Sequence, residues 1–202
     1  MFLADVDVTG DAFEEFMRET GRPYSAGSFR AQGRALAVGV SCLPLDTIRR
    51  AMAHPNAVLV DVGLTYSHHT LVDDTLADVK PLLDANGVTL IDASPLAMGL
   101  LTTSGPQPWH PASSQLKAAC AKQAACDSSP RLEEVALAYA CRTPIGASVL
   151  VGCRTLVEFR ANANVAYQCR MPNIIVPVAW ASSLHTTPTD EARIRDHLLD
   201  LN

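Results

Sequence analysis

Short apolar segments alternate along the chain with stretches in which apolar residues recur at helical spacing. The apolar segments are residues 2–8, 35–41, 57–66, 88–93 and 147–152. Each is followed by a helical stretch, so the pattern predicts five βα units. The segments are apolar almost without interruption, which is typical of parallel strands that are covered on both faces.

Two of the predicted helices flank the last strand, and another follows the third. Their apolar positions are Val72, Leu76, Val79 and Leu83, then Leu132, Val135, Ala136 and Tyr139, then Leu156, Phe159 and Ala163. Asn86-Gly87 supplies a C-terminal stop for the first of these helices. Residues 187–201 begin with Thr-Pro and two acidic residues, which predicts a C-terminal helix. Glycine, proline and serine in residues 21–33 indicate a loop insertion or a degenerate helix.

The alternating pattern leaves two α/β architectures open, a doubly wound sheet and a barrel. A complete (β/α)8 barrel takes about 250 residues and eight units. This chain has 202 residues and shows five. Residues 1–202 are expected to form a single domain.

Composition narrows the possible partners. The net charge is -5 and the basic residues form no stripe, so neither nucleic acid nor an anionic membrane is an expected partner. The longest apolar run is far shorter than the roughly 20 residues that span a bilayer, and the N-terminus does not resemble a secretory signal. A cytoplasmic location is the expectation.

The cysteines and histidines do not suggest a metal site or a disulfide framework. No CxxC pair occurs among the six cysteines, which are Cys42, Cys120, Cys126, Cys141, Cys153 and Cys169. We expect reduced thiols that behave as small apolar residues. Adjacent residues on a strand face opposite sides, so His68 and His69 are not expected to share a metal ion.

One block of sequence carries a family resemblance. It runs from Asp92-Ala-Ser-Pro-Leu-Ala-Met98 through Gly105-Pro106 to Trp109-His-Pro-Ala-Ser113, and residues 39–46, 61–68 and 149–152 support it. This block resembles the aldo-keto reductase family, in particular its L-galactose dehydrogenase type, over residues 1 to 170. The resemblance implies a partial (β/α)8 TIM barrel, with strands four to eight and a C-terminal helix in a truncated domain.

The resemblance also implies a catalytic tetrad of Asp, Tyr, Lys and His, which this chain does not match. The first three belong to strands that have no counterpart here, and Ala4 stands at the position of the histidine. No catalytic residue is therefore assigned. The family activity would be oxidation of an aldose, such as L-galactose, at the anomeric carbon with NAD or NADP, and we expect this chain to be inactive by itself. The alternative is a non-catalytic half barrel that binds a nucleotide or a partner, and the uncovered edges of such a sheet predict self-association.

The resemblance implies a nicotinamide site at the ends of the second and third strands of this chain. Ser41 and Cys42 occupy the place of a pair that hydrogen-bonds the carboxamide, with cysteine the poorer donor. Tyr66 ends the next strand, where it would face the nicotinamide or simply belong to the barrel core.

The phosphate and adenine contacts are implied further along the chain. Ser94, Pro95 and Leu96 would flank the pyrophosphate. Gly152 and Arg154 open the last barrel helix, whose free amides form an anion site, although Arg154 also fits a solvated helix start. Asn162 matches an adenine contact. Glu158 favours NAD and Arg154 favours NADP, so the preference stays open.

The substrate side is assigned to the loop after the fourth strand. Trp109 and His110 lie in this loop, on the face where barrel active sites form. These two residues are the candidates for aldose binding. The alternative is that the Trp-His-Pro turn packs the loop against the rest of the protein.

Overall fold

A computed structural model describes residues 2–5, 13, 14, 17, 26–126, 130–142 and 145–169. It divides into two compact units. The first comprises the described residues of Met1–Tyr66, Thr75–Ala93 and Ile145–Ser148, and the second those of Ser67–Asp74, Ser94–Pro144 and Val149–Asn202. The predicted helix at 187–201 lies outside the described residues. Within the described part, no helix is long and apolar enough to cross a membrane.

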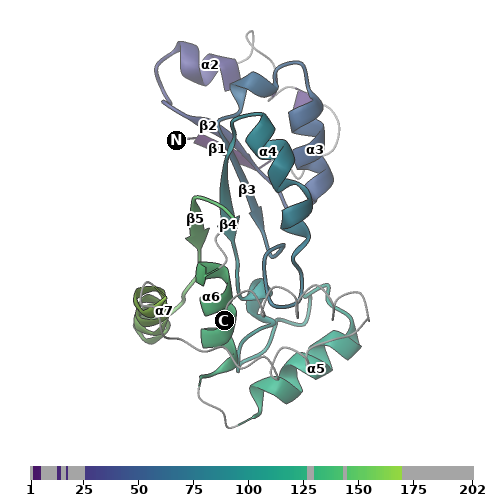
Figure 1. Cartoon of the computed structure of the whole chain (residues 1–202), viewed down its shortest axis with the longest axis vertical. Helices are drawn as coiled ribbons and strands as arrows, with labels where there is room; N and C mark the ends of the chain where they lie inside the picture. Colours follow the sequence, from purple (N-terminus) through teal and green to yellow (C-terminus); the bar gives the residue numbers. More distant parts are fainter. Residues whose placement is uncertain are drawn as a thin grey trace. The chain divides into compact units, whose positions relative to one another are not determined.

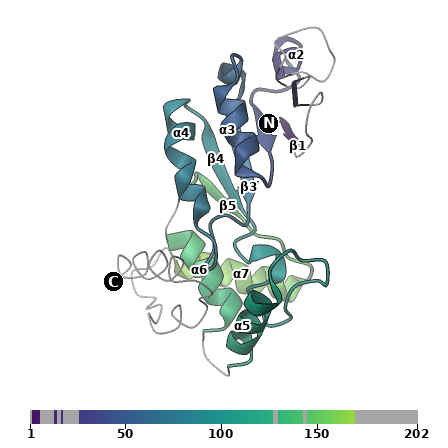
Figure 2. The ribbon, with the colours of Figure 1, turned by 90° about the vertical axis from the view of Figure 1, so that its right-hand side faces the viewer.

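The strands form one sheet in chain order, as the sequence predicts (Figures 1 and 2). They are β1 (Phe2–Asp5), β2 (Val38–Ser41), β3 (Val62–Tyr66), β4 (Thr89–Ala93) and β5 (Ser148–Leu150). The pairs β1–β2, β2–β3 and β3–β4 are parallel. The prediction of an α/β fold with a parallel sheet is confirmed.

The third strand begins later than predicted. Residues 57–59 form a short 3-10 helix, η1 (Ala57–Leu59), in which the Val60 amide donates to the Ala57 carbonyl at 2.9 Å. Only from Val62 does the chain pair with β2. The apolar run therefore predicted the strand correctly but placed its start too early.

The helices of the first unit are α2 (Ala26–Ala31), α3 (Leu45–Ala53), η2 (Thr75–Asp78) and α4 (Lys80–Ala85). Val72 was predicted to lie in the helix before Asn86 and does not. The Thr70 hydroxyl accepts hydrogen bonds from the Val72 and Asp73 amides and so holds a turn there. Pro81 lies in the first turn of α4, and the helix ends at the predicted Asn86-Gly87.

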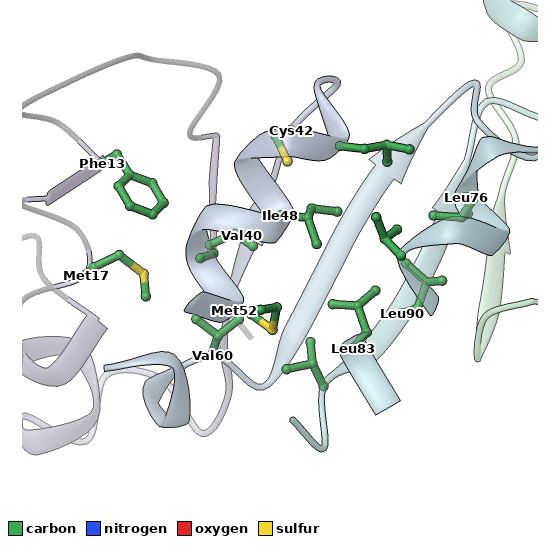
Figure 3. Close-up of a cluster of buried hydrophobic side chains, with 14 of the residues drawn as sticks. Phe13, Met17, Val40, Cys42, Ile48, Met52, Val60, Leu76, Leu83 and Leu90 are labelled. Carbon is green, nitrogen blue, oxygen red and sulfur yellow. The ribbon is translucent and has the colours of Figure 1, made fainter. Parts of the chain in front are cut away.

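Helices α3 and α4 lie against the same face of the sheet (Figures 1 and 2). The apolar side chains between these helices and strands β2 and β4 form the core of the first unit (Figure 3). Ile48 and Leu83 are fully buried there, and Leu90 is 2% exposed. Burying a side chain of this size stabilises the fold by about 1.5–3 kcal/mol.

A carboxylate links α2 to strand β2. Asp61 accepts a hydrogen bond from the Val38 amide at 2.8 Å and forms an ion pair with Arg30. Partial burial by itself raises the pKa of the Asp61 carboxyl, but the bonds from Arg30 and Val38 outweigh it and hold the pKa below its ordinary value. The carboxylate is therefore charged at neutral pH and satisfies an amide at the start of the strand.

The second unit contains η3 (Ala97–Gly99), α5 (Ser114–Ala124), α6 (Leu132–Arg142) and α7 (Leu156–Gln168). Helix α6 is the most deeply buried, and Tyr139 is its largest buried side chain. Helix α7 lies where the sequence predicts it, but its expected apolar face is not covered by the described residues. Leu156 is 61% and Phe159 is 56% exposed, whereas Val165 is buried.

Gly146 is expected to tolerate no side chain. A Cβ atom there would lie 2.7 Å from the carbonyl oxygen of Leu90, and the next amide, of Ala147, donates to that same oxygen at 2.8 Å. Gly146→Ala should therefore destabilise the protein by about 1–3 kcal/mol. Gly152→Ala is the matched control, because its Cβ would meet nothing within 4 Å. Equal urea midpoints for the two variants would contradict the expectation.

Candidate functional site

Ser41 and Tyr66 end neighbouring parallel strands at the same edge of the sheet. Ser41 pairs with Leu64 in β3, and Tyr66 pairs with Ala93 in β4. Alternate residues of a strand share a face, so Tyr66 lies on the face of Leu64 and hence of Ser41. Both side chains are half-buried. Ligands of parallel α/β sheets bind outside the carboxyl ends of the strands, which is where these two residues lie.

The structure places the side chain of Cys42 away from this edge. Its thiol is fully buried in the core of the first unit, close to Ile48 (Figure 3). Its amide donates to the Leu64 carbonyl at 3.1 Å. Strand alternation explains this, because the residue after Ser41 turns to the opposite face of the sheet. Ser41 thus remains as the side-chain donor of the predicted pair.

Ser94, Pro95 and Leu96 form a tight turn directly after β4. Ser94 has a positive φ of 60°, and its hydroxyl accepts a hydrogen bond from the Met98 amide at 3.0 Å. Its own amide donates to the Leu150 carbonyl at 2.9 Å. Pro95 is buried and Leu96 packs against the apolar clusters of the second unit. The turn therefore offers a rigid backbone, while its serine hydroxyl is used internally.

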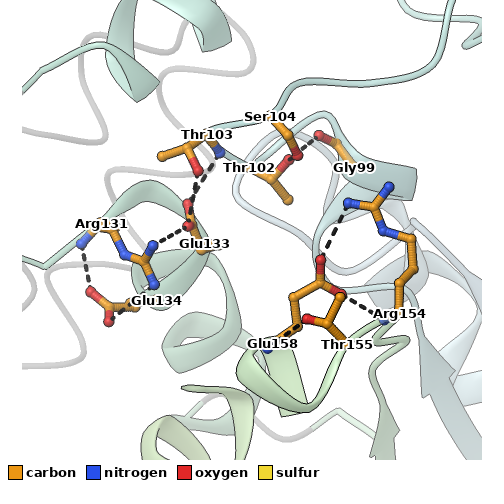
Figure 4. Close-up of polar contacts among 10 residues, drawn as sticks. All are labelled: Gly99, Thr102, Thr103, Ser104, Arg131, Glu133, Glu134, Arg154, Thr155 and Glu158. Carbon is orange, nitrogen blue, oxygen red and sulfur yellow. Dashed lines mark hydrogen bonds and ion pairs between the residues drawn. The ribbon is translucent and has the colours of Figure 1, made fainter. Parts of the chain in front are cut away.

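Gly152 and Arg154 precede α7, and both are exposed. Figure 4 shows Arg154 beside Glu158. Arg154 donates to Glu158 twice, from its amide at 2.5 Å and from its guanidinium at 3.2 Å. The hydrogen bond from that amide is the main reason that the pKa of Glu158 is below its ordinary value. Thr155 caps the helix by accepting from the Glu158 amide at 3.1 Å. The Glu158 carboxylate therefore binds the guanidinium and the backbone amide of Arg154, the two groups that a bound phosphate would contact.

Asn162 lies on the same side of α7 as this ion pair. Glu158 and Asn162 are four residues apart within α7 and so lie on one face of the helix. Arg154 precedes the N-cap Thr155 and is linked to this face by its ion pair with Glu158. Asn162 is half-buried, whereas Arg154 is exposed. Arg154 and Asn162, a predicted phosphate contact and the predicted adenine contact, are therefore both adjacent to Glu158, the first through its ion pair and the second by its position one turn along α7.

The loop with Trp109 and His110 is fixed by hydrogen bonds to the histidine ring. Nδ1 accepts from the Ala112 amide at 3.1 Å, so Nε2 carries the proton and donates to the Ala97 carbonyl at 2.9 Å. Both ring nitrogens are engaged, and His110 is 7% exposed. This favours the loop-packing alternative for His110. Trp109 is 67% exposed and is the residue of the pair that can meet a substrate.

A second contact holds the loop after β4 to α6. The Glu133 carboxylate accepts from the amide and the hydroxyl of Thr103, both at 3.2 Å, and pairs with Arg131 at 3.3 Å (Figure 4). Glu133 lies in the first turn of α6, where a negative charge is favoured by the helix dipole. The loop that carries Trp109 is thus anchored at its start by Glu133 and further on by His110.

A polar contact that the sequence pattern did not predict follows β3. Ser67 has a positive φ of 66°, and the Nδ1 atom of His68 lies 3.2 Å from the carboxylate of Asp73. His69 is buried, with its ring 5.1 Å from that of Tyr139. The sequence feature that could have predicted this contact is the run of polar residues directly after the end of β3. In the described part of the chain, no group of three or more His, Cys, Asp or Glu residues is arranged to hold a metal ion.

Known proteins resemble this chain in sequence and in fold. The sequence model of the Aldo/keto reductase family matches residues 27–171. L-galactose dehydrogenase of Arabidopsis thaliana is 40% identical over 135 residues, which are 66% of this chain and 42% of that protein. This chain thus spans less than half the length of that relative.

Solved structures with the same fold include an aldo-keto reductase of Bacillus halodurans. Its apo form matches with a TM-score of 0.58 at 18% identity, over 98% of this chain and 60% of that one. Its holo form matches with a TM-score of 0.50 at 19% identity, over 86% and 52%. The described sheet and helices therefore correspond to part of a TIM barrel, as predicted. The family match covers well over half of the sequence, and the chain belongs to the aldo/keto reductase family.

Proposed function

We propose that this chain is the nucleotide-binding part of an oxidoreductase that oxidises an aldose at its anomeric carbon with NAD or NADP. The family supports an oxidoreductase, and the 40% identical relative is an L-galactose dehydrogenase. The proposal treats residues 1–202 as one functional domain and gives it a cytoplasmic location. Because the chain spans part of its relatives' length, the proposal assigns it nucleotide binding and not proton transfer.

The observation that carries the proposal is the arrangement of polar groups around Glu158 at the start of α7. Gly152 has open space where a side chain would be, which lets a diphosphate approach the backbone closely. Arg154 is exposed two residues further on and pairs with Glu158, and Asn162 lies on the same face of α7 as Glu158. A guanidinium suits a phosphate, and an amide suits the polar edge of adenine. These residues therefore fit the adenosine end of a nicotinamide nucleotide.

The nicotinamide end is assigned to Ser41 and Tyr66. A serine hydroxyl both donates and accepts, so Ser41 suits the carboxamide. The half-buried ring of Tyr66 on the same sheet face can limit how the nicotinamide lies. When bound, the nicotinamide supplies the hydride acceptor. Trp109 is proposed to contact the sugar, because an exposed aromatic ring suits the apolar face of a pyranose.

Glu158 is proposed to weaken binding of phosphate to Arg154. Its carboxylate already pairs with the guanidinium and with the backbone amide of that residue. A second phosphate on the adenosine ribose would meet this negative charge. Glu158 therefore favours NAD over NADP in this arrangement, although both remain candidates.

Titration calorimetry on the full chain is expected to show weak binding of NAD and NADP. Arg154→Ala should weaken the binding by about 3- to 10-fold, since it removes a charge-assisted contact. Glu158→Gln should strengthen it, and more for NADP than for NAD. Arg160→Ala is the matched control, because Arg160 is an exposed arginine on the same helix. Absence of heat at millimolar nucleotide with a folded sample would refute the assignment.

A second candidate function is a partner-binding half barrel without catalysis. The observation that favours it is the exposed apolar surface at the start of α7, where Leu156, Val157 and Phe159 are all more than half exposed. Such a patch is typical of an interaction surface. Self-association of the chain stays a prediction of this candidate. Nucleotide binding in the calorimetric experiment separates the two, because the second candidate does not require it.

A further inference from the structure

We propose that Cys141 and Cys169 form a redox-active dithiol site, which a hydroperoxide oxidises to a disulfide between α6 and α7. The site is separate from the proposed nucleotide contacts and does not depend on them.

The two thiols meet where the C-terminal ends of α6 and α7 lie together. Cys141 is the next-to-last residue of α6, and Cys169 is the residue that caps the end of α7. Both are half-buried and pack against one apolar cluster, formed by Leu137, Ala138 and Val165. The Sγ atom of Cys169 lies 3.9 Å from the Ala138 carbonyl oxygen, one turn before Cys141 on α6.

The side chains of Cys141 and Cys169 are also hydrogen-bonded to each other, and Arg142 donates to Cys169. A disulfide has an S–S bond of about 2.05 Å, so the two sulfur atoms must approach one another for the bond to form. The contact of Cys169 with Ala138, three residues before Cys141 on α6, places the two thiols in one small cluster from which this approach can occur. All six cysteines of the chain are thiols in the structure.

The surroundings favour the thiolate of Cys169. The hydrogen bond from Cys141 lowers the pKa of the Cys169 thiol most, and the charge and hydrogen bond of Arg142 add to it against the opposing effect of burial, so that the pKa is about 7. A large part of Cys169 is then thiolate at neutral pH, and the thiolate is the nucleophilic form. Cys120 shows the contrast, since burial raises its pKa to about 11.

The reaction proceeds in two steps. The Cys169 thiolate attacks an oxygen of the hydroperoxide, the O–O bond breaks, and Cys169 becomes a sulfenic acid while hydroxide or an alkoxide leaves. The Cys141 sulfur then attacks the Cys169 sulfur, the S–OH bond breaks, and the thiol proton leaves with hydroxide as water. The two thiols are oxidised by two electrons and the hydroperoxide is reduced. A small dithiol reverses the reaction by exchange.

Peptide mapping of the full chain after mild hydrogen peroxide treatment tests the site. The expected product is a Cys141–Cys169 cross-linked peptide, with the intact mass lower by two hydrogens and restored by dithiothreitol. Cys141→Ser should stop at a sulfenic acid on Cys169 that dimedone traps, whereas Cys169→Ser should give no dimedone adduct on Cys141 under the same conditions. Cys153→Ser is the matched control and should form the cross-link at the rate of the unmodified chain, because Cys153 is exposed and distant in sequence from both thiols.

A second measurement needs no variant. Iodoacetamide labelling at pH 7 should modify Cys169 about 10-fold faster than the exposed Cys126, because a pKa of about 7 makes a large part of Cys169 thiolate. The labelling rate of Cys169 should rise with pH through a midpoint near 7. Equal labelling of the two cysteines, or a peroxide product in which Cys169 is paired with neither Cys141 nor dimedone, would overturn the proposal.

Discussion

The purified 202-residue chain is expected to show no oxidation of L-galactose or related aldoses with NAD or NADP. Oxidation of a sugar carbon requires a base that takes the hydroxyl proton as the hydride leaves. The resemblance assigns this to a tyrosine assisted by a lysine, and neither residue of that motif is in the sequence. A positioned proton-transfer group contributes about 10²- to 10⁴-fold to the rate. Loss of this group alone is expected to lower the rate of a slow dehydrogenase below the detection limit of the assay.

Two of the three lysines of the chain are engaged by other groups in the structure. The chain has three, and Lys80 pairs with Asp84 at 2.6 Å on α4. Lys117 donates to the His110 carbonyl at 2.6 Å, and Lys122 lies in the last turn of α5. None of the three matches the lysine of the family's motif. For the same reason Ala4→His, which restores the family's histidine on β1, is not expected to restore turnover.

Absorbance of the reduced cofactor provides the assay for this expectation. The unmodified chain, Ala4→His and Tyr66→Phe are compared at equal concentration, with circular dichroism as the control for folding. Turnover in the unmodified chain that Tyr66→Phe abolishes would show that Tyr66 is the catalytic base. Turnover that survives Tyr66→Phe would place the base elsewhere in the chain.

The sheet could be predicted because each strand is a compact apolar run with turn residues around it. The element bounds were predicted wrongly where apolar residues do not form the regular strand or α-helix that their spacing suggests. Val58 belongs to the apolar run before β3, yet it lies in η1 and is 79% exposed. Val72 fits a helical period, but the Thr70 hydroxyl holds a turn there. Side-chain hydrogen bonds to the backbone compete with regular structure, and the hydrophobic pattern does not record them.

Helix α5 was not predicted, for a related reason. It buries little apart from Cys120 and Gln123, so its hydrophobic periodicity is weak. The available signal was Ser113, whose hydroxyl accepts from the Leu116 amide at the start of the helix. Serine before an alanine-rich stretch is an N-cap pattern that can be read without any apolar face.

The site could be predicted where it depends on strand ends and helix starts, and less well where it depends on contacts. Ser41 and Tyr66 lie at one sheet edge because parallel strands end together. The burial of Cys42 follows from strand alternation and was available from the sequence. The ion pair of Arg154 with Glu158 was a possible i,i+4 pair, but the second bond to the Arg154 amide depends on the chain's bend before α7. The meeting of Cys141 with Cys169 depends on how α6 and α7 pack, which no local pattern specifies.

Tyr139→Ala is expected to have the largest effect on stability in the second unit. The side chain is 1% exposed and is the largest of those that are fully buried. It packs in one cluster with Leu71, Leu101 and Leu132, and its ring lies 5.1 Å from that of His69. Truncating a buried aromatic ring to alanine removes its buried area and leaves a cavity, at a cost of about 3–5 kcal/mol.

The exposed Tyr167 provides the matched control for this substitution. Its side chain is 66% exposed on α7, so Tyr167→Ala should change the free energy of unfolding by less than about 0.5 kcal/mol. Tyr139→Phe keeps the ring and should retain most of the stability. Urea unfolding followed by circular dichroism measures all three variants, and the midpoint should fall strongly for Tyr139→Ala alone. A midpoint for Tyr139→Ala equal to that for Tyr167→Ala would mean that the cluster around α6 does not stabilise the second unit, because the same atoms would have been removed from both sites with the same result.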